Sequence, residues 1–136
     1  MMEDEVTLTI PMRPDMELKV THIASSVAEA MRLDKDKIDE IKLALIEACL
    51  NAIEHSKSKD KKVHIKFKMT GDRLEIIIKD YGVGFNPSKI KEPKIEEKLK
   101  SPSKRGWGLK IMRSLMDSVV INSHKGGTKI VMTKRR

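Results

Sequence analysis

Three polar side chains recur every four residues within EACLNAIEH, residues 47–55. In a helix this spacing places Glu47, Asn51 and His55 on one face. A carboxylate and an amide side by side could orient a nucleophile and supply an oxygen ligand to magnesium. A solvated stripe on an amphipathic helix has the same spacing, and His55 alone would suit the negative end of the helix dipole. The pattern therefore indicates catalysis only in combination with other motifs.

A glycine-rich segment, DYGVGF at residues 80–85, directly follows an expected strand. Gly82 and Gly84 would let a ligand approach the backbone closely, and Asp80 could accept a hydrogen bond there. The segment is not a dinucleotide-binding fingerprint, because Pro87 stands in place of the third glycine and no helical pattern follows at once. An ordinary turn that leaves a strand would use the same glycines.

A third motif, KRGWGL at residues 104–109, opens a short helical pattern. Lys104 and Arg105 stand just before Gly106 and Gly108. Free N–H groups, the helix dipole and two cations would together attract a phosphate group at this position. Neither Gly-Lys-Ser nor Gly-Lys-Thr occurs in the chain, which excludes a Walker-type loop.

Strands and helices must hold these motifs in place. Alternating apolar and polar residues predict five strands. We expect them at residues 6–12, 63–69, 74–78, 119–121 and 130–132. Turns at Gly71-Asp72 and Gly126-Gly127 would join them into two hairpins.

Apolar residues at helical spacing predict three helices. We expect them at about residues 15–31, 34–55 and 109–116. The second carries two apolar stripes, one through Ile41 and Leu45 and one through Leu43 and Leu50, so we expect it to be broadly buried. Strands joined in hairpins, with the helices grouped together, predict an α+β two-layer sandwich and not a parallel doubly wound sheet.

Residues 86–105 contain three prolines, seven Lys or Arg residues and almost no apolar periodicity. Loops of about 20 residues without secondary structure are uncommon in compact domains, and such loops are often lids or binding loops. We therefore expect a basic lid beside the third motif.

The 136 residues carry a formal net charge of +8, with 39% hydrophobic and 35% charged residues, as in a single globular domain. Residues 1–85 hold 14 basic and 16 acidic side chains, whereas residues 86–136 hold 14 and 4. The four aromatic residues are few for a surface that stacks bases. A local anion site or an acidic partner explains this charge better than general nucleic-acid binding does.

Cellular location is indicated by what the chain lacks. Its single cysteine, Cys49, excludes an internal disulfide and a cysteine-based zinc site. No apolar run approaches the roughly 20 residues of a membrane-spanning helix, and the acidic start MMEDEVTL does not resemble a signal peptide. We therefore expect a cytoplasmic protein.

In this order and spacing, the three motifs resemble those of the GHKL ATPase superfamily, named for gyrase, heat-shock chaperones, histidine kinases and mismatch-repair proteins. Residues 47–55 look like its N box, residues 80–84 and 106–109 like its two glycine boxes, and Gly127-Thr128 like its closing glycine–threonine element. The resemblance implies one Bergerat-type ATP-binding domain over residues 1–136, with a mostly antiparallel mixed sheet, helices on one face and an ATP lid at about 86–105.

The resemblance also implies roles for single residues. Asn51 would coordinate the magnesium ion that bridges the phosphates, and Glu47 would act as general base or orient a serine hydroxyl. Asp80 would bind the adenine amino group, with Thr128 in support. The remaining nucleotide contacts would come from Gly82, Gly84, Lys104, Arg105, Gly106, Trp107, Gly108 and Leu109.

Within the superfamily, the small size, the form of the N box and the segment Leu115-Met116-Asp117 look most like bacterial anti-sigma factor serine/threonine kinases. Such a protein would use ATP and Mg²⁺ to phosphorylate an anti-sigma factor antagonist on serine. It would also sequester a sigma factor, as a homodimer that needs neither nucleic acid nor membrane. Two alternatives stay open: the ATP-binding domain of a histidine kinase, and a nucleotide-gated sigma-binding module without catalysis.

Overall fold

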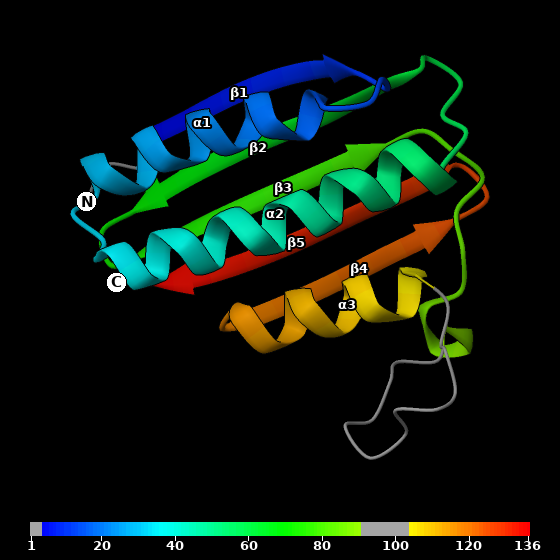
Figure 1. The fold of residues 1–136 in the computed structure, drawn as a ribbon. Coiled ribbons are helices and arrows are strands. Elements are labelled where there is room, and N and C mark those ends of the chain that lie inside the picture. The colour runs from blue at the N-terminus through cyan, green and yellow to red at the C-terminus, as the bar shows by residue number, and fades with distance from the viewer. Residues whose placement is uncertain (1–3, 91–103) are drawn as a thin grey trace.

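The computed structural model describes residues 4–90 and 104–136, which form a five-stranded sheet with three helices on one of its faces (Figure 1). This confirms the expected α+β two-layer fold. The strands are β1 (Asp4–Pro11), β2 (Lys62–Thr70), β3 (Arg73–Asp80), β4 (Ser118–His124) and β5 (Gly127–Arg135). The helices are α1 (Met16–Ala30), α2 (Lys35–His55) and α3 (Lys104–Leu115), with a short 3-10 turn η1 (Pro87–Lys89).

The strand order in the sheet is β1-β2-β3-β5-β4, and every neighbouring pair is antiparallel. The resemblance had implied a mostly antiparallel mixed sheet. Within the described residues the sheet is fully antiparallel. The two predicted hairpins, β2–β3 and β4–β5, are confirmed. The register places Asp80, at the end of β3, opposite Thr128 on β5. Two motifs that are distant in sequence thus meet at one end of the sheet.

Helix α2 begins where the sequence predicts it. The Asp34 carboxylate caps it by accepting a hydrogen bond from the Lys37 N–H at 2.9 Å. One stripe, through Ile41 and Leu45, is fully buried against the sheet. The expected broad burial is wrong for the other stripe, because Leu43 is 54% exposed. The reason is that α2 packs on the sheet below it, and nothing in the described residues covers its outer face.

Helix α3 begins at Lys104, five residues earlier than the expected start at Leu109. Gly106 and Gly108 have poor helix propensity, so the pattern favoured a loop there. Packing of α3 against α2 outweighs that local preference. Strands β4 and β5 are likewise longer than the expected three residues each, since β5 pairs with β3 along almost its whole length and β4 pairs with β5.

The C-terminal end of α3 is fixed by a buried lysine. The Lys134 ammonium group on β5 donates to the Leu115 carbonyl and lies 3.1 Å from the Glu40 carboxylate. The whole residue is only 5% exposed, and a buried ammonium group needs such partners. Nearby, the Asp117 carboxylate accepts a hydrogen bond from the Arg135 N–H at 2.6 Å. These contacts join α2, α3 and β5.

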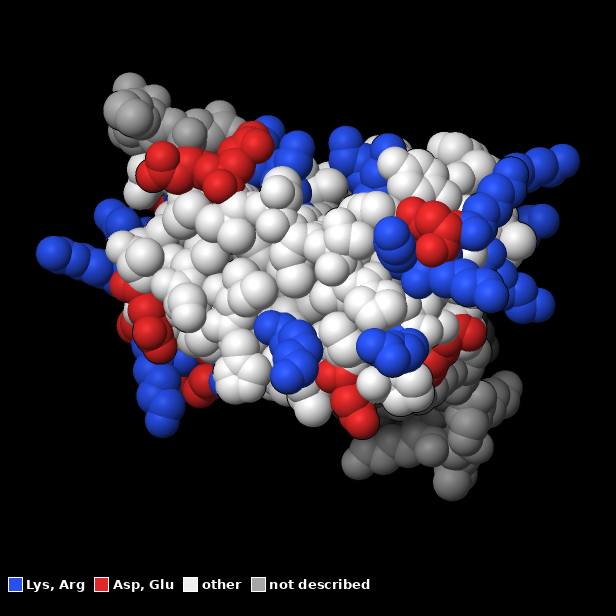
Figure 2. Space-filling model, turned by 90° about the horizontal axis from the view of Figure 1, so that it is seen from above, with Lys and Arg blue, Asp and Glu red and all other residues white. Residues whose placement is uncertain are grey.

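The surface on the β1 side carries few charges at its centre. Seen from above, Lys, Arg, Asp and Glu lie mainly around its margin (Figure 2). Leu18 of α1 is 50% exposed. We call this area, β1 with the adjoining outer side of α1, the β1 surface. No helix of the described residues is long and apolar enough to cross a bilayer.

Candidate active site

The three polar residues of the first motif face a small cavity between α2 and α3. The cavity is lined by Glu47, Leu50, Asn51, Glu54, His55, Gly108 and Met112. Asn51 is only 9% exposed and Glu47 is half-buried, which argues against a solvated polar stripe. His55 is the last residue of α2, where the helix dipole favours a positive charge.

Gly108 lets α3 approach the carboxylate of Glu47. A Cβ atom added at Gly108 would lie 3.0 Å from Glu47 Oε2, closer than ordinary van der Waals contact. The second glycine of the third motif therefore has a packing role beside Glu47, which the residue pattern alone does not indicate. The two motifs form one site because this close contact joins their helices.

Replacing Gly108 by alanine should separate stability from activity. We expect Gly108→Ala to raise the free energy of unfolding by up to about 1 kcal/mol, because alanine is the better helix former. The new methyl group should displace the Glu47 carboxylate and lower kcat at least about tenfold, since small displacements of a reacting group are costly. Chemical denaturation and steady-state kinetics measure the two effects. Unchanged kcat would contradict the packing role.

The N-terminal end of α3 presents backbone N–H groups. The first four N–H groups of a helix have no partner within it, so they can bind an anion. Gly106 is buried, Trp107 is 45% exposed, and the side chain of Leu109 is in the core, so Leu109 could contact a ligand only through its backbone. The side chains of Lys104 and Arg105 lie outside the described residues.

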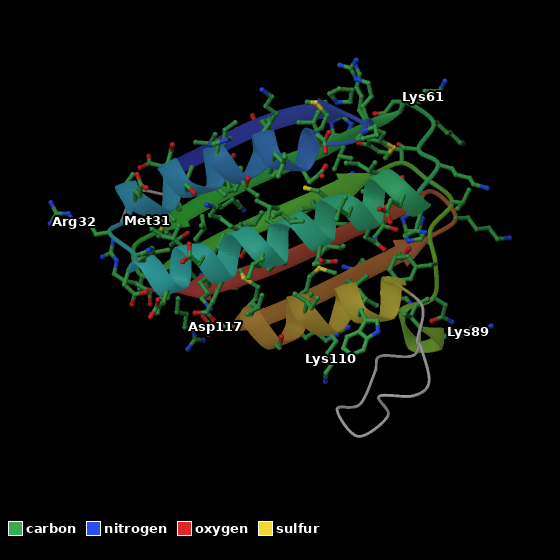
Figure 3. All side chains as sticks on the ribbon, viewed as in Figure 1. Met31, Arg32, Lys61, Lys89, Lys110 and Asp117 are labelled. Atoms are coloured by element: carbon green, nitrogen blue, oxygen red, sulfur yellow. The ribbon has the colours of Figure 1, made fainter. Side chains whose placement is uncertain are left out.

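Lys110 is the next cation along α3. Its side chain projects from the side of α3 that faces away from α2 (Figure 3). The Lys110 side chain therefore does not supply positive charge to the cavity between α2 and α3. The predicted roles of Lys104 and Arg105 stay predictions.

Asp80 and Thr128 form the opposite end of the candidate site. Both are buried, at 3% and 4% exposure, and they pair across β3 and β5. Asp80 Oδ1 accepts a hydrogen bond from the Gly82 N–H at 2.9 Å. A buried carboxylate and a buried hydroxyl that are this close suit recognition of a donor group such as an amine.

Ser123 is a residue that sequence reasoning missed. Its hydroxyl lies 2.7 Å from the Thr128 hydroxyl and accepts a hydrogen bond from the Phe85 N–H at 2.7 Å. It therefore joins the glycine-rich segment to β5. The only signal that could have found it is the register of β4 and β5, which pairs Ser123 with Thr128.

The two ends of the site meet at the C-terminal end of α2. A Cβ atom at Gly82 would lie 1.8 Å from the Ser56 carbonyl oxygen, and the Val83 N–H donates to the same oxygen at 2.8 Å. Ser56 follows Asn51 by five residues, or about 7.5 Å along the helix axis. The glycine-rich segment thus packs directly on the helix that carries Glu47 and Asn51.

Residues 57–62 contact Tyr81, the residue that follows Asp80. The Ser58 hydroxyl accepts from the Tyr81 N–H at 3.0 Å and donates to Asp60 at 2.8 Å. Asp60 lies 2.7 Å from His64 Nε2, and this hydrogen bond is the main cause that lowers the pKa of Asp60 to about 2. The carboxylate that organises this turn is therefore ionised at neutral pH.

Cys49 lies on α2 but does not belong to the chemistry of the site. It is fully buried, and burial, with a smaller effect of Glu17, raises the pKa of its thiol to about 12. The thiol stays protonated and unreactive at neutral pH. Cys49 is therefore a small core residue.

A magnesium site built from protein side chains alone is not present in the described residues, which hold no cluster of three or more His, Cys, Asp or Glu. Magnesium bound with a nucleotide needs fewer, because it keeps several waters and takes phosphate oxygens. The buried amide of Asn51, with the Glu47 carboxylate one turn before it, fits such a donor set.

Comparison with protein families decides the relationship. The model of the histidine kinase-like ATPase domain matches residues 10–134. The chain belongs to the histidine kinase-like ATPase family. The match spans all three motifs and confirms the resemblance to the GHKL superfamily.

Among the relatives of this histidine kinase-like ATPase are serine-protein kinases. The chain is 33% identical to the serine-protein kinase RsbW of Bacillus subtilis, over 96% of this chain and 85% of that protein. It is 31% identical to RsbW of Bacillus mycoides, over 96% and 84%.

Solved structures share the fold. One contains the RsbU and RsbW domains of Rv1364c from Mycobacterium tuberculosis, with a TM-score of 0.73 and 19% identity over 97% of this chain. The matched region makes up 32% of that longer chain. The histidine kinase domain of EL346 from Erythrobacter litoralis gives a TM-score of 0.56 at 17% identity, over 97% of this chain and 67% of that one.

Proposed function

We propose that this chain is an ATP-dependent protein serine kinase that acts as an anti-sigma factor. It phosphorylates an anti-sigma factor antagonist on serine and sequesters a sigma factor, and so regulates transcription from the cytoplasm. The similarity to serine-protein kinases over almost the whole chain supports the activity. The observation that carries the proposal is that half-buried Glu47 and buried Asn51 line one cavity with Gly108, in the N-terminal half of α3, and that Gly108 lies against Glu47.

Phosphoryl transfer depends mainly on positioning and on stabilisation of charge. In the proposed site Asp80 and Thr128 hold the adenine, and the N–H groups of the first turn of α3 bind the phosphates, together with Lys104 and Arg105. Asn51 helps to hold Mg²⁺, which offsets phosphate charge when bound with ATP. Glu47 orients the serine hydroxyl of the antagonist and accepts its proton as the serine oxygen bonds to the γ-phosphorus and the bond to ADP breaks.

Transfer of labelled phosphate from ATP to the purified cognate antagonist tests this proposal. We expect label on serine that survives acid, whereas phosphohistidine would be lost. Asn51→Ala should abolish the transfer, because the magnesium ligand is removed. Acid-labile label would support a histidine kinase domain instead. ATP binding without transfer would support a sigma-binding module without catalysis.

We further propose that the protein is a homodimer that associates through the β1 surface. Strand β1 lies at the edge of the sheet, where one side of its backbone has no neighbouring strand in the described residues. The few charges at the centre of this surface and the exposed Leu18 support association there (Figure 2). This contact does not involve the face of the sheet opposite the three helices.

A further inference from the structure

The face of the sheet opposite the three helices has no helix on it in the described residues (Figure 1). The register arranges its outward side chains in rows that run across the strands. The first row is Thr9, His64, Lys79, Lys129 and Asn122, from β1 to β4. The second row is Thr7, Lys66, Ile77, Val131 and Val120. We call these the cationic row and the apolar row.

The cationic row places like charges side by side. Lys79 and Lys129 are directly opposite each other on β3 and β5, and such pairs destabilise a sheet. Both side chains are exposed, and within the described part of the chain no carboxylate pairs with either, or with Lys66. Lys79 has a cation–π contact, with its ammonium 5.0 Å from the Tyr81 ring centre. A bound anionic group would offset this repulsion.

His64, the next member of the cationic row, already has a carboxylate partner. Its Nε2 lies 2.7 Å from Asp60, and its Nδ1 lies 3.3 Å from the Thr9 hydroxyl. Among the described residues of the two rows, the charged groups without a carboxylate partner are therefore Lys66, Lys79 and Lys129. They line one open groove, together with Thr7, Thr9 and Ile77.

The apolar row lies two residues along the strands from the cationic row, a separation of about 7 Å. Val120 is 52% exposed, and Ile77 and Val131 are half-buried. Both rows cross five strands, or about 19 Å at the usual strand spacing. A helix of about 13 residues has this length, and its diameter of about 10 Å spans both rows.

We propose that this sheet face binds an amphipathic helix of a partner protein, with acidic residues against Lys79 and Lys129 and apolar residues against Ile77, Val131 and Val120. This surface lies on the opposite side of the sheet from Glu47 and Asn51. A nucleic acid would satisfy the lysines but would leave the apolar row uncovered. A lipid surface is flat, whereas Ile77 lies in a groove between the lysines.

The test uses a fluorescein-labelled peptide of 14 residues, with leucine and glutamate placed to give one apolar and one acidic side in a helix. The control peptide has the same composition in scrambled order. We expect the patterned peptide to bind at least tenfold more tightly than the scrambled one in fluorescence anisotropy. Lys79→Glu and Lys129→Glu should each weaken binding at least tenfold. Lys19→Glu, the same charge change on α1, should leave it unchanged.

Three outcomes would overturn the proposal. The first is equal binding of the patterned and scrambled peptides. The second is equal binding of the patterned peptide by the Lys129→Glu and Lys19→Glu variants. The third is tighter binding of a DNA duplex or of phosphatidylglycerol vesicles than of the patterned peptide. Circular dichroism checks that each variant is folded. The free protein gives a second measurement, because Lys129→Gln should raise Tm by removing the repulsion from Lys79. A lower Tm would show that Lys79 and Lys129 do not repel each other in the free protein, and would contradict the argument that a bound anionic group offsets repulsion.

Discussion

Glu47→Gln is expected to lower kcat for phosphoryl transfer by about 10²–10⁴-fold, the usual contribution of a general base. Glutamine keeps the size of the side chain but cannot accept the serine proton. The half-buried carboxylate lies against Gly108 in a cavity that also holds Asn51, so water cannot readily replace its function. Nucleotide affinity should change little, because the proposed role of Glu47 is on the acceptor serine and not on ATP. Single-turnover kinetics with the antagonist measures the effect.

The matched control for Glu47→Gln is Asp39→Asn, which removes a carboxylate from an exposed position two turns earlier on α2. It should retain full activity. Nucleotide binding can be followed in both variants by the fluorescence of Trp107, the single tryptophan of the chain, at the N-terminal end of α3. If Glu47→Gln keeps more than a tenth of the wild-type kcat, Glu47 is not the general base.

Gly82→Ala is expected to destabilise the protein by about 3 kcal/mol, at the upper end of the usual cost of overpacking. The added Cβ would lie 1.8 Å from the Ser56 carbonyl, a backbone atom that no rotamer change can move. The glycine-rich segment would have to separate from α2, which would break the hydrogen bond from Val83 to Ser56. It would also release Asp80, so nucleotide binding should be lost.

Thermal unfolding measures the cost of Gly82→Ala. A loss of about 3 kcal/mol corresponds to a decrease in Tm of roughly 10 °C for a domain of this size. Gly71→Ala is the control, because Gly71 is exposed in the β2–β3 turn and its φ is not positive. Equal Tm values for the two variants would contradict the close contact between the glycine-rich segment and α2.

Local signals predicted the elements that hold the site. The Asp34 cap marked the start of α2, and alternation with a Gly71-Asp72 turn marked the β2–β3 hairpin. The start of α3 could not be predicted in this way, because packing against α2 overrides the low helix propensity of Gly106 and Gly108. Local pattern also could not show that Leu43 is exposed, since burial depends on which neighbours cover a helix.

Within the candidate site, the sequence predicted which residues stand on one helix face but not how the motifs meet. The contact between Gly82 and Ser56, and the hydrogen bond between Ser123 and Thr128, depend on the placement of distant segments. Serines in such positions have no pattern of their own, because a single hydroxyl on a strand or after a helix is common. Only the three-dimensional structure identifies their partners.

The strand order has a consequence for synthesis of the chain. β5 is the last of the five strands to leave the ribosome, yet it lies inside the sheet, between β3 and β4. Until β5 is inserted, β3 has an open edge and Asp80 lacks Thr128 beside it. A nascent chain therefore carries the N-box helix early but completes the pair of Asp80 and Thr128, the proposed adenine site, last. We expect it to bind nucleotide only after release of nearly the whole domain.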